Sequence, residues 1–134
     1  MKAVRLHHIG IVLKSLKTAQ DFMERFGLEE DYREYVEVYH AWCIFTKYTE
    51  RESPIEFVIP TEGVLMEYNK GKGGIHHIAF EVDDVKAIRE EFEERELRML
   101  ETEPVRGAGN IIVNFLRPRH GFGVLVEFVE RTDK

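Results

Sequence analysis

Cysteine is almost missing from this sequence, which has Cys43 alone among 134 residues. No disulfide can therefore form within the chain, and we expect a protein of a reducing compartment, the cytoplasm. Positive charge is also scarce, because 19 lysines and arginines stand against 25 aspartates and glutamates, for a net charge of −6. A chain with this balance has no overall attraction for nucleic acid or for an anionic membrane surface.

Long apolar runs are missing as well. The first ten residues, MKAVRLHHIG, lack the apolar stretch of a secretory signal peptide. No other stretch approaches the roughly 20 apolar residues that cross a bilayer, so we expect no membrane partner. What is present is 43% hydrophobic and 33% charged residues, the balance of a globular domain with a sizeable core.

The first half of the chain predicts one helix and four strands. Residues 5–13 are apolar and rich in β-branched side chains, which indicates a buried strand. Apolar residues at helical spacing from Leu16 to Phe26 indicate a helix, with Ser15 as its N-cap and Gly27 at its end. The strands expected after this helix are 31–38, 41–48 and 54–60.

The second half repeats the same order. A strand at 75–82 precedes a helix with Val85, Ile88 and Phe92 on its apolar face. Further strands are expected near 97–100, 110–116 and 123–130. The repeat predicts an α+β fold of two tandem βαβββ modules whose sheets could pair into one curved mixed surface with the repeated positions facing inward. We expect one domain, 1–134, with module one at 4–61, a linker at 62–73 and module two at 74–131.

Histidine and glutamate recur at matching places in the two modules. His8 and His77 are 69 positions apart, and Glu56 and Glu127 are 71 apart. A carboxylate in such an apolar strand is either on the solvent face or buried with a partner, because burying it alone costs several kcal/mol. Two imidazoles and two carboxylates suit a divalent cation such as Zn, Co, Ni, Mn or Fe. We expect these four residues to be its ligands.

Each module begins with two adjacent histidines, and strand geometry separates them. Successive side chains point to opposite faces of a strand, so His8 shares its face with Gly10, and His77 shares its face with Ala79. Small neighbours leave room for a bound molecule beside a ligand. We therefore assign the second histidine of each pair to the metal and the first to packing.

These segments resemble the vicinal oxygen chelate superfamily, whose members pair βαβββ modules around a divalent metal. The resemblance covers nearly the whole chain and is greatest to the methylmalonyl-CoA epimerase branch, with the glyoxalase I branch next. The stretches that carry it are HHIGIVLKSLKTAQDF, IEFVIP, GGIHHIAFEVDDV and EPVRGAGNIIVNFLRPRHGFGVLVEFVE. The resemblance implies the same four metal ligands and a homodimer.

The resemblance also implies an isomerase or epimerase that moves a proton next to a carbonyl. Its substrate would be a small dicarbonyl-type compound such as an acyl-CoA thioester. A metal chelated by two substrate oxygens acts as a Lewis acid and stabilises the enolate. Epimerisation then needs one base on each side of the carbon.

The base is where this sequence departs from the epimerase branch, which carries Glu-Gln-Gly on its second strand. Aligned through AWCIF, that triplet falls on Val38, Tyr39 and His40. Glu37 is adjacent but, by strand alternation, should face the other way unless a bulge intervenes. The candidates for the base are therefore Glu37, His40 and Glu127.

Two glycine-bounded loops, 106–110 and 117–123, carry arginines that could hold the phosphates of a CoA thioester. The candidate substrate-binding residues are Arg106, Arg117, Arg119 and Lys72. Ordinary solvated charge is the alternative for each of them. A lysine that the family places before the VNF strand is Ile112 here, which weakens the CoA inference. Phe122 is expected in the core or in a pocket wall.

Three other functions fit the same fold. A glyoxalase-like lyase acting on a glutathione hemithioacetal uses the same four ligands, so only substrate assays separate it. An extradiol dioxygenase on ferrous iron usually needs two histidines and one glutamate, and Glu56 as a fourth ligand argues against it. A non-catalytic ligand-binding protein tends to lose the metal ligands, which are present, but the missing Glu-Gln-Gly keeps this alternative open.

Overall fold

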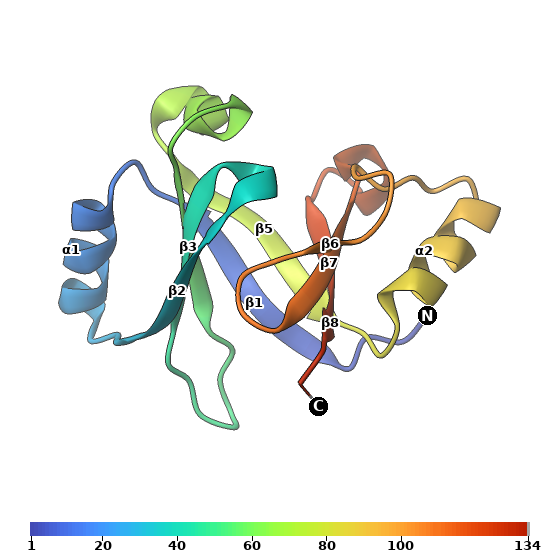
Figure 1. Cartoon of the computed structure of the whole chain (residues 1–134), viewed down its shortest axis with the longest axis horizontal. Helices are drawn as coiled ribbons and strands as arrows, with labels where there is room; N and C mark the ends of the chain where they lie inside the picture. The colour runs from blue at the N-terminus through green and yellow to red at the C-terminus, as the bar shows by residue number, and fades with distance from the viewer. Residues whose placement is uncertain (134) are drawn as a thin grey trace. The chain divides into compact units, whose positions relative to one another are not determined.

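The computed structural model describes residues 1–133, and the chain divides into two compact units. One unit is formed by residues 8–76. The other is formed by residues 1–7 together with the chain from His77 onward. The divisions fall inside two strands, β1 (Arg5–Val12) and β5 (Gly74–Glu81). Figure 1 labels the elements along the chain.

The unit of residues 8–76 is a mixed sheet with strand order β2-β3-β4-β1. β1 pairs with β4 in parallel, and the other neighbours are antiparallel. Its elements beside β1 are α1 (Leu16–Phe26), β2 (Glu30–Val36), η1 (Glu37–Tyr39), β3 (Ala41–Thr46), β4 (Ile55–Pro60) and η2 (Val64–Gly71). The predicted order of one helix and four strands is confirmed for this half of the chain.

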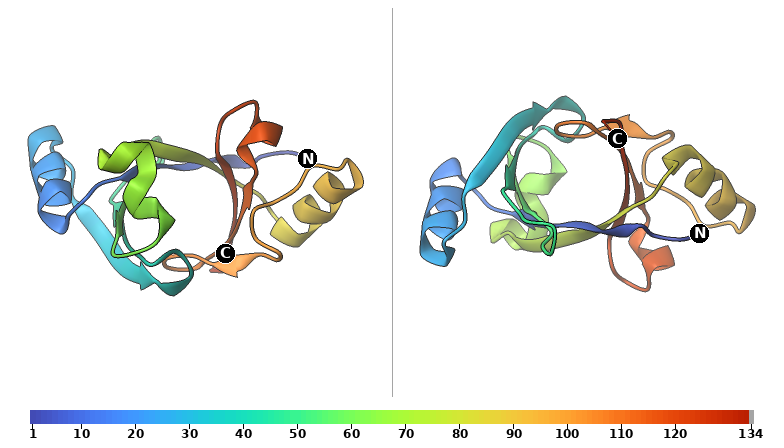
Figure 2. Two further views of the ribbon diagram at one scale, coloured as in Figure 1. Left: turned by 90° about the horizontal axis from the view of Figure 1, so that it is seen from above. Right: turned by 90° about the horizontal axis from the view of Figure 1, so that it is seen from below.

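Helix α1 covers one face of this sheet, as Figures 1 and 2 show. The hydroxyl of Ser15 accepts a hydrogen bond from the backbone N–H of Thr18 at 3.1 Å, and Gly27 ends the helix in the left-handed conformation. The buried side chains between helix and sheet are Ile11, Ala19, Met23, Ile44, Phe57 and Ile59. Because strand side chains alternate, the residues next to these in β1 and β4 point to the opposite face.

The second unit has strand order β5-β8-β7-β6, with β5 parallel to β8 and the other pairs antiparallel. Its further elements are α2 (Val85–Glu94), β6 (Val105–Arg106), β7 (Ile111–Leu116), η3 (Pro118–Gly121) and β8 (Val126–Arg131). Asp84 caps α2 by accepting from the N–H of Ala87 at 3.1 Å. The core between α2 and the sheet is Val82, Val85, Phe92, Met99, Leu116 and Phe128.

A buried polar network also joins α2 to β7. Arg89 Nη1 donates to the backbone carbonyl of Glu101 at 2.8 Å and to Asn114 Oδ1 at 2.9 Å. Asn114 Nδ2 donates in turn to Glu101 Oε1 at 2.7 Å. Asn114 is fully buried, so these bonds meet the hydrogen-bonding needs of a side chain that water cannot reach.

Four strand predictions differ from the structure by two residues or more, including 41–48, which ends at Thr46, and 123–130, which begins at Val126. The strand expected near 97–100 is reduced to one bridge between Met99 and Leu116, and the two-residue strand β6 follows instead. The strand expected at 31–38 ends at Val36, where a 3₁₀ turn begins. The formation of a strand and the position of its ends are set by pairing partners that lie elsewhere in the sequence.

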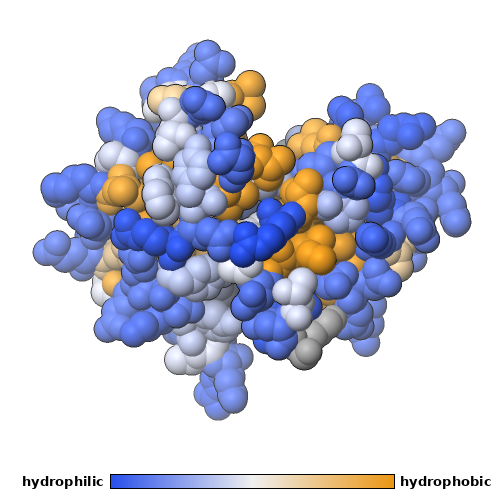
Figure 3. Space-filling view, viewed as in Figure 1, coloured by the Kyte–Doolittle hydropathy of each residue, from blue (hydrophilic) through white to orange (hydrophobic). Residues whose placement is uncertain are grey.

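Neither helix of the described residues is long and apolar enough to cross a membrane. The face drawn in Figure 3 is largely hydrophilic, with apolar residues visible in places.

Candidate metal centre

His8 and Glu56 lie on neighbouring strands of the unit of residues 8–76 and share a face. The parallel register of β1 and β4 pairs Gly10 with Glu56, and His8 is two residues before Gly10 on the face opposite α1. His8 Nε2 is 3.3 Å from Glu56 Oε1, and the two residues are 0% and 7% exposed. A carboxylate at this depth requires a positive partner, such as a protonated imidazole or a metal ion.

His77 and Glu127 repeat this arrangement in the second unit. The parallel register of β5 and β8 pairs Ala79 with Glu127, as Gly10 pairs with Glu56. His77 Nε2 is 3.3 Å from Glu127 Oε1, and the residues are 3% and 5% exposed. The repeat seen in the sequence is therefore a repeat of the local geometry as well.

Each pair has the geometry of two ligands of one divalent ion. Zinc binds histidine nitrogen and carboxylate oxygen at about 2.0–2.2 Å, so two neighbouring ligands of one ion are roughly 3.0–3.5 Å apart. The separation of 3.3 Å in both pairs falls in that range. An imidazole with a carboxylate also suits Zn, Co, Ni, Mn or Fe. The residues present therefore fit such an ion.

A phenylalanine supports the imidazole of each pair. The ring of Phe45 meets His8 edge to face at 5.0 Å, and the ring of Phe115 meets His77 in the same way at 5.1 Å. Phe45 is paired with Glu56 across β3 and β4, and Phe115 is paired with Glu127 across β7 and β8. The two phenylalanines are 70 positions apart, so their positions repeat like those of the ligands.

Glu37 and His40 do not lie in a strand. Residues Glu37–Tyr39 form the 3₁₀ turn η1, and His40 follows in the left-handed conformation with φ of 51°. Glu37 is exposed, while His40 Nδ1 is 3.1 Å from Glu62 Oε1. The argument from strand alternation does not apply here, because the chain turns between β2 and β3 without a glycine or proline to mark the turn.

Tyr32 and Glu34 were missed by the sequence analysis. The register pairs Tyr32 with Phe45 and Glu34 with Cys43, which places both on the face that carries His8. The Tyr32 ring stacks on Phe45 at 5.1 Å. Burial raises the pKa of the Tyr32 phenol far above its ordinary value, and the negative charge of Glu56 adds to the effect. Tyr32 therefore stays a neutral O–H donor near Glu56.

The four candidate substrate-binding cations lie at or near the surface. Arg117, Arg119 and Lys72 are exposed, and Arg119 Nε donates to His120 Nε2 at 3.3 Å. Arg106 Nη2 donates to the carbonyl oxygen of Gly109 at 3.1 Å. A cavity of about 370 Å³ next to Arg106 is lined by residues of β6, β7 and their connecting loop, and by Thr132.

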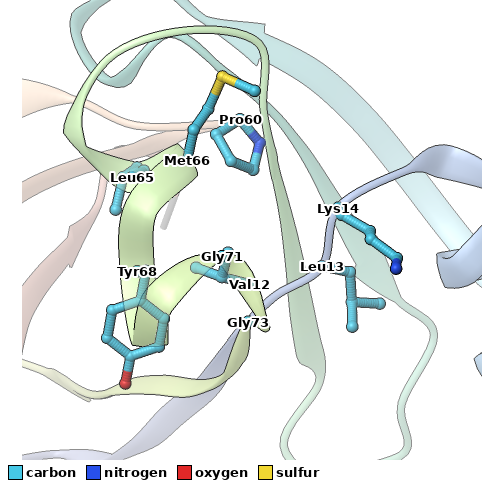
Figure 4. Close-up of a pocket in the computed structure, with 9 residues that line it drawn as sticks. All are labelled: Val12, Leu13, Lys14, Pro60, Leu65, Met66, Tyr68, Gly71 and Gly73. Carbon is cyan, nitrogen blue, oxygen red and sulfur yellow. The ribbon is translucent and has the colours of Figure 1, made fainter.

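A second cavity lies under η2 and is drawn in Figure 4. The side chains around it come from η2 and from the ends of β1 and β4, and they include Leu13, Pro60, Leu65, Met66 and Tyr68. Its volume of about 40 Å³ holds roughly one water molecule. It is too small to be a substrate site.

Comparison with known proteins gives a family model and relatives that cover most of the chain. A family model described as the glyoxalase/bleomycin resistance protein/dioxygenase superfamily matches residues 7–115. The ethylmalonyl-CoA/methylmalonyl-CoA epimerase of Cereibacter sphaeroides is 34% identical over 130 residues, which cover 92% of this chain and 95% of that protein. The uncharacterized protein YqjC of Bacillus subtilis is 30% identical over 128 residues, which cover 94% and 91%.

A solved structure is similar over nearly the whole chain. It is a Streptomyces coelicolor methylmalonyl-CoA epimerase variant in complex with 2-nitronate-propionyl-CoA. Its sequence identity is 29% and its TM-score is 0.88, with 97% of this chain and 99% of that chain covered. The predicted α+β fold and the resemblance drawn from the sequence are thus confirmed. The chain belongs to the glyoxalase/bleomycin resistance protein/dioxygenase superfamily, that is, the vicinal oxygen chelate superfamily.

Proposed function

We propose that this protein is a metal-dependent isomerase or epimerase that moves a proton next to the carbonyl of a small acyl-CoA thioester. The observation that carries the proposal is the buried His–Glu pair, which occurs in both units with the same separation of 3.3 Å. The similarity to methylmalonyl-CoA epimerases over at least 92% of the chain supports this reaction over others of the superfamily.

The proposed ligands of one divalent ion are His8, Glu56, His77 and Glu127. When bound, a Co, Zn, Ni, Mn or Fe ion would supply Lewis acidity that lowers the energy of an enolate. The protein's own part is to hold two imidazoles by their edge-to-face contacts with Phe45 and Phe115. It also buries the two carboxylates so that water does not compete for the ion.

Proton transfer requires a base on each side of the substrate carbon. Glu127 remains a candidate because it is buried beside His77. For the other base we favour Glu34 over Glu37 and His40, because Glu34 shares the sheet face of His8 and Glu56. Tyr32, on the same face, would donate a hydrogen bond to a developing oxygen anion.

The phosphates of CoA are the proposed partners of Arg106, Arg117, Arg119 and Lys72. Guanidinium groups bind phosphate oxygens with paired hydrogen bonds. A homodimer and a cytoplasmic location stay predictions from the sequence.

The test is proton NMR of methylmalonyl-CoA in heavy water with cobalt-loaded protein. We expect the signal of the proton between the two carbonyls to disappear faster than without protein, and His77→Ala and His8→Ala to slow this loss at least about a hundredfold. Protein that holds metal but leaves the signal at its background rate would refute the epimerase proposal. The next substrate to test would be the glutathione hemithioacetal of methylglyoxal, because the lyase alternative uses the same ligands.

A further inference from the structure

The connection between β7 and β8 carries an exposed aromatic ring on an unusual backbone. Phe122 is 99% exposed, and its φ is 59°. A bulky side chain rarely adopts this left-handed conformation, because Cβ crowds the following carbonyl. Because the ring is almost fully exposed, no packing contact of the ring offsets this strain of the backbone. Backbone strain that persists without a packing reason is found mainly at binding and catalytic sites.

Hydrogen bonds hold the loop in this conformation. The N–H of His120 donates to the carbonyl of Arg117 at 2.9 Å, and the N–H of Gly123 donates to that of Pro118 at 2.8 Å. The N–H of Val124 donates to the carbonyl of Gly121 at 3.0 Å. Phe122 is therefore presented to solvent by an ordered turn. A Cβ built on Gly123 would meet no atom within 4 Å, so the backbone beside the ring is open.

The surrounding segment is basic in an acidic protein. The net charge of the chain is −6, yet the sequence from Pro104 to Val126 contains no aspartate or glutamate. The same segment contains Arg106, Arg117 and Arg119. Arg117 and Arg119 are exposed on the same turn as Phe122. An anionic ligand with a flat ring fits this combination, because arginine binds phosphate and an aromatic face stacks on a base.

We propose that Phe122 stacks on the adenine ring of the CoA thioester, with Arg117 and Arg119 binding its phosphates. This inference rests on the proposed function, since it names the subsite for the distal part of that substrate. Phe122 precedes Glu127 by five residues, a span of at most about 17 Å. The pantetheine arm and diphosphate of CoA are long enough to cover this distance.

A protein partner is the less suitable occupant of this loop. The central part of a protein interface is depleted in charge and needs a contiguous apolar area. Here a single ring lies between two glycines, five residues after Arg117 and three after Arg119. The loop therefore favours a small anionic ligand with one aromatic base.

The deciding experiment is calorimetric titration with phosphoadenosine diphosphate, the nucleotide half of CoA, which has no reacting carbon. We expect Phe122→Gly to raise Kd about tenfold and Phe122→Tyr to leave it unchanged, because stacking needs only an aromatic face. Arg117→Ala and Arg119→Ala should each raise Kd as well. The matched control is Val64→Ala, which removes an apolar side chain that is 84% exposed in the other unit and should not change Kd.

Thermal unfolding separates loss of binding from loss of fold. Phe122→Gly removes the strained Cβ and leaves no cavity, so its Tm should equal or exceed that of the wild type by roughly 1–4 °C. Weaker nucleotide binding at an unchanged or higher Tm supports the subsite. An unchanged nucleotide Kd in Phe122→Gly overturns it, and so does a wild type that binds no nucleotide. A variant that only changes self-association also overturns it.

Activity then distinguishes this inference from the proposed function. With methylmalonyl-CoA we expect Phe122→Gly to raise KM about tenfold at unchanged kcat. With methylmalonyl-pantetheine, which lacks the nucleotide, KM should not change. If the wild type does not exchange the proton of either thioester, the proposed function fails. The nucleotide Kd of the variants then still decides whether the subsite exists.

Discussion

At the scale of single residues, the face opposite α1 collects groups with complementary properties. Burial and a nearby carboxylate keep Tyr32 protonated. Glu56 Oε1 lies 3.3 Å from the Nε2 atom of the His8 imidazole, which when protonated would offset the negative charge of the carboxylate. Phe45 separates these groups by contacting both Tyr32 and His8 with its ring. One face of this sheet therefore carries a hydrogen-bond donor, Tyr32, and a pair of candidate metal ligands, His8 and Glu56.

The choice between two nearby glutamates can be tested by exchange kinetics. Glu34→Gln removes a carboxylate from the face of His8, and we expect it to slow proton exchange on methylmalonyl-CoA by about a hundredfold or more. Glu37→Gln changes an exposed carboxylate in η1 and should leave the rate unchanged. A slow exchange rate in Glu37→Gln together with an unchanged rate in Glu34→Gln would indicate that Glu37 is the base. Bound metal should be measured in both variants, so that loss of the ion is not mistaken for loss of the base.

The raised pKa of Tyr32 predicts a specific pH dependence of stability. A tyrosine whose pKa is higher in the folded state stabilises the fold fully below its unfolded pKa of about 10. This contribution is lost as pH rises above that value, because the unfolded chain then releases its proton first. The Tm of the wild type should therefore fall more steeply from pH 9 to 11 than that of Tyr32→Phe. Parallel curves would contradict a phenol that the fold keeps neutral by partial burial.

At the scale of elements, Gly27 after α1 and Gly73 after η2 both have positive φ but different reasons to be glycine. Gly27 ends α1 at φ of 68° in open space. Gly73, at φ of 72°, lies so close to β1 that a Cβ would overlap the carbonyl oxygen of Val12. One position needs only the left-handed backbone, and the other also needs the missing side chain.

These two positions make a matched pair of substitutions. Gly27→Ala should lower the free energy of unfolding by about 1–2 kcal/mol, the cost of the left-handed conformation. Gly73→Ala should cost about 2 kcal/mol more, because backbone atoms of β1 must also move. Urea unfolding of both variants measures the difference. Equal losses would mean that the segment after η2 shifts freely away from Val12.

At the scale of the whole molecule, the chain is a repeat in which each unit has a helix-covered sheet and a buried His–Glu pair on the opposite face. The two halves have diverged elsewhere. The segment from Pro104 to Val126 is free of acids, whereas its counterpart in the first half, residues 35–55, contains Glu37, Glu50 and Glu52. The repeat thus carries the proposed metal chemistry, and the divergent segment carries the proposed nucleotide subsite.

Metal stoichiometry tests whether the two pairs act together. If one ion takes both pairs as ligands, purified protein loaded with cobalt should hold one ion per chain, and His8→Ala or His77→Ala should each abolish tight binding. Two ions per chain, each lost with its own pair, would contradict a shared ion. Cobalt at 100 times its Kd should stabilise the fold by about 2.7 kcal/mol, and a chelator should reverse the rise in Tm.

The sequence by itself determined the elements and the pairs of candidate ligands. Capping residues and apolar spacing are local signals, so α1 with its cap Ser15 and the apolar face of α2 could be predicted. The His–Glu pairs were visible because a repeated module preserves the spacing between a ligand and its strand. The family was inferred from the resemblance of the quoted segments to the vicinal oxygen chelate superfamily, and the comparisons confirm it.

Only the tertiary structure decided where β2 ends, which of its side chains share the face of His8, and that Phe122 is exposed. These properties depend on pairing with strands and cores distant in the sequence, and no local signal encodes them. The sequence of Glu37 and Val38 continues the pattern of a strand, but the chain turns there to pair β2 with β3. Phe122 is an apolar residue of the kind usually found in a core, but the turn before β8 holds its ring in solvent.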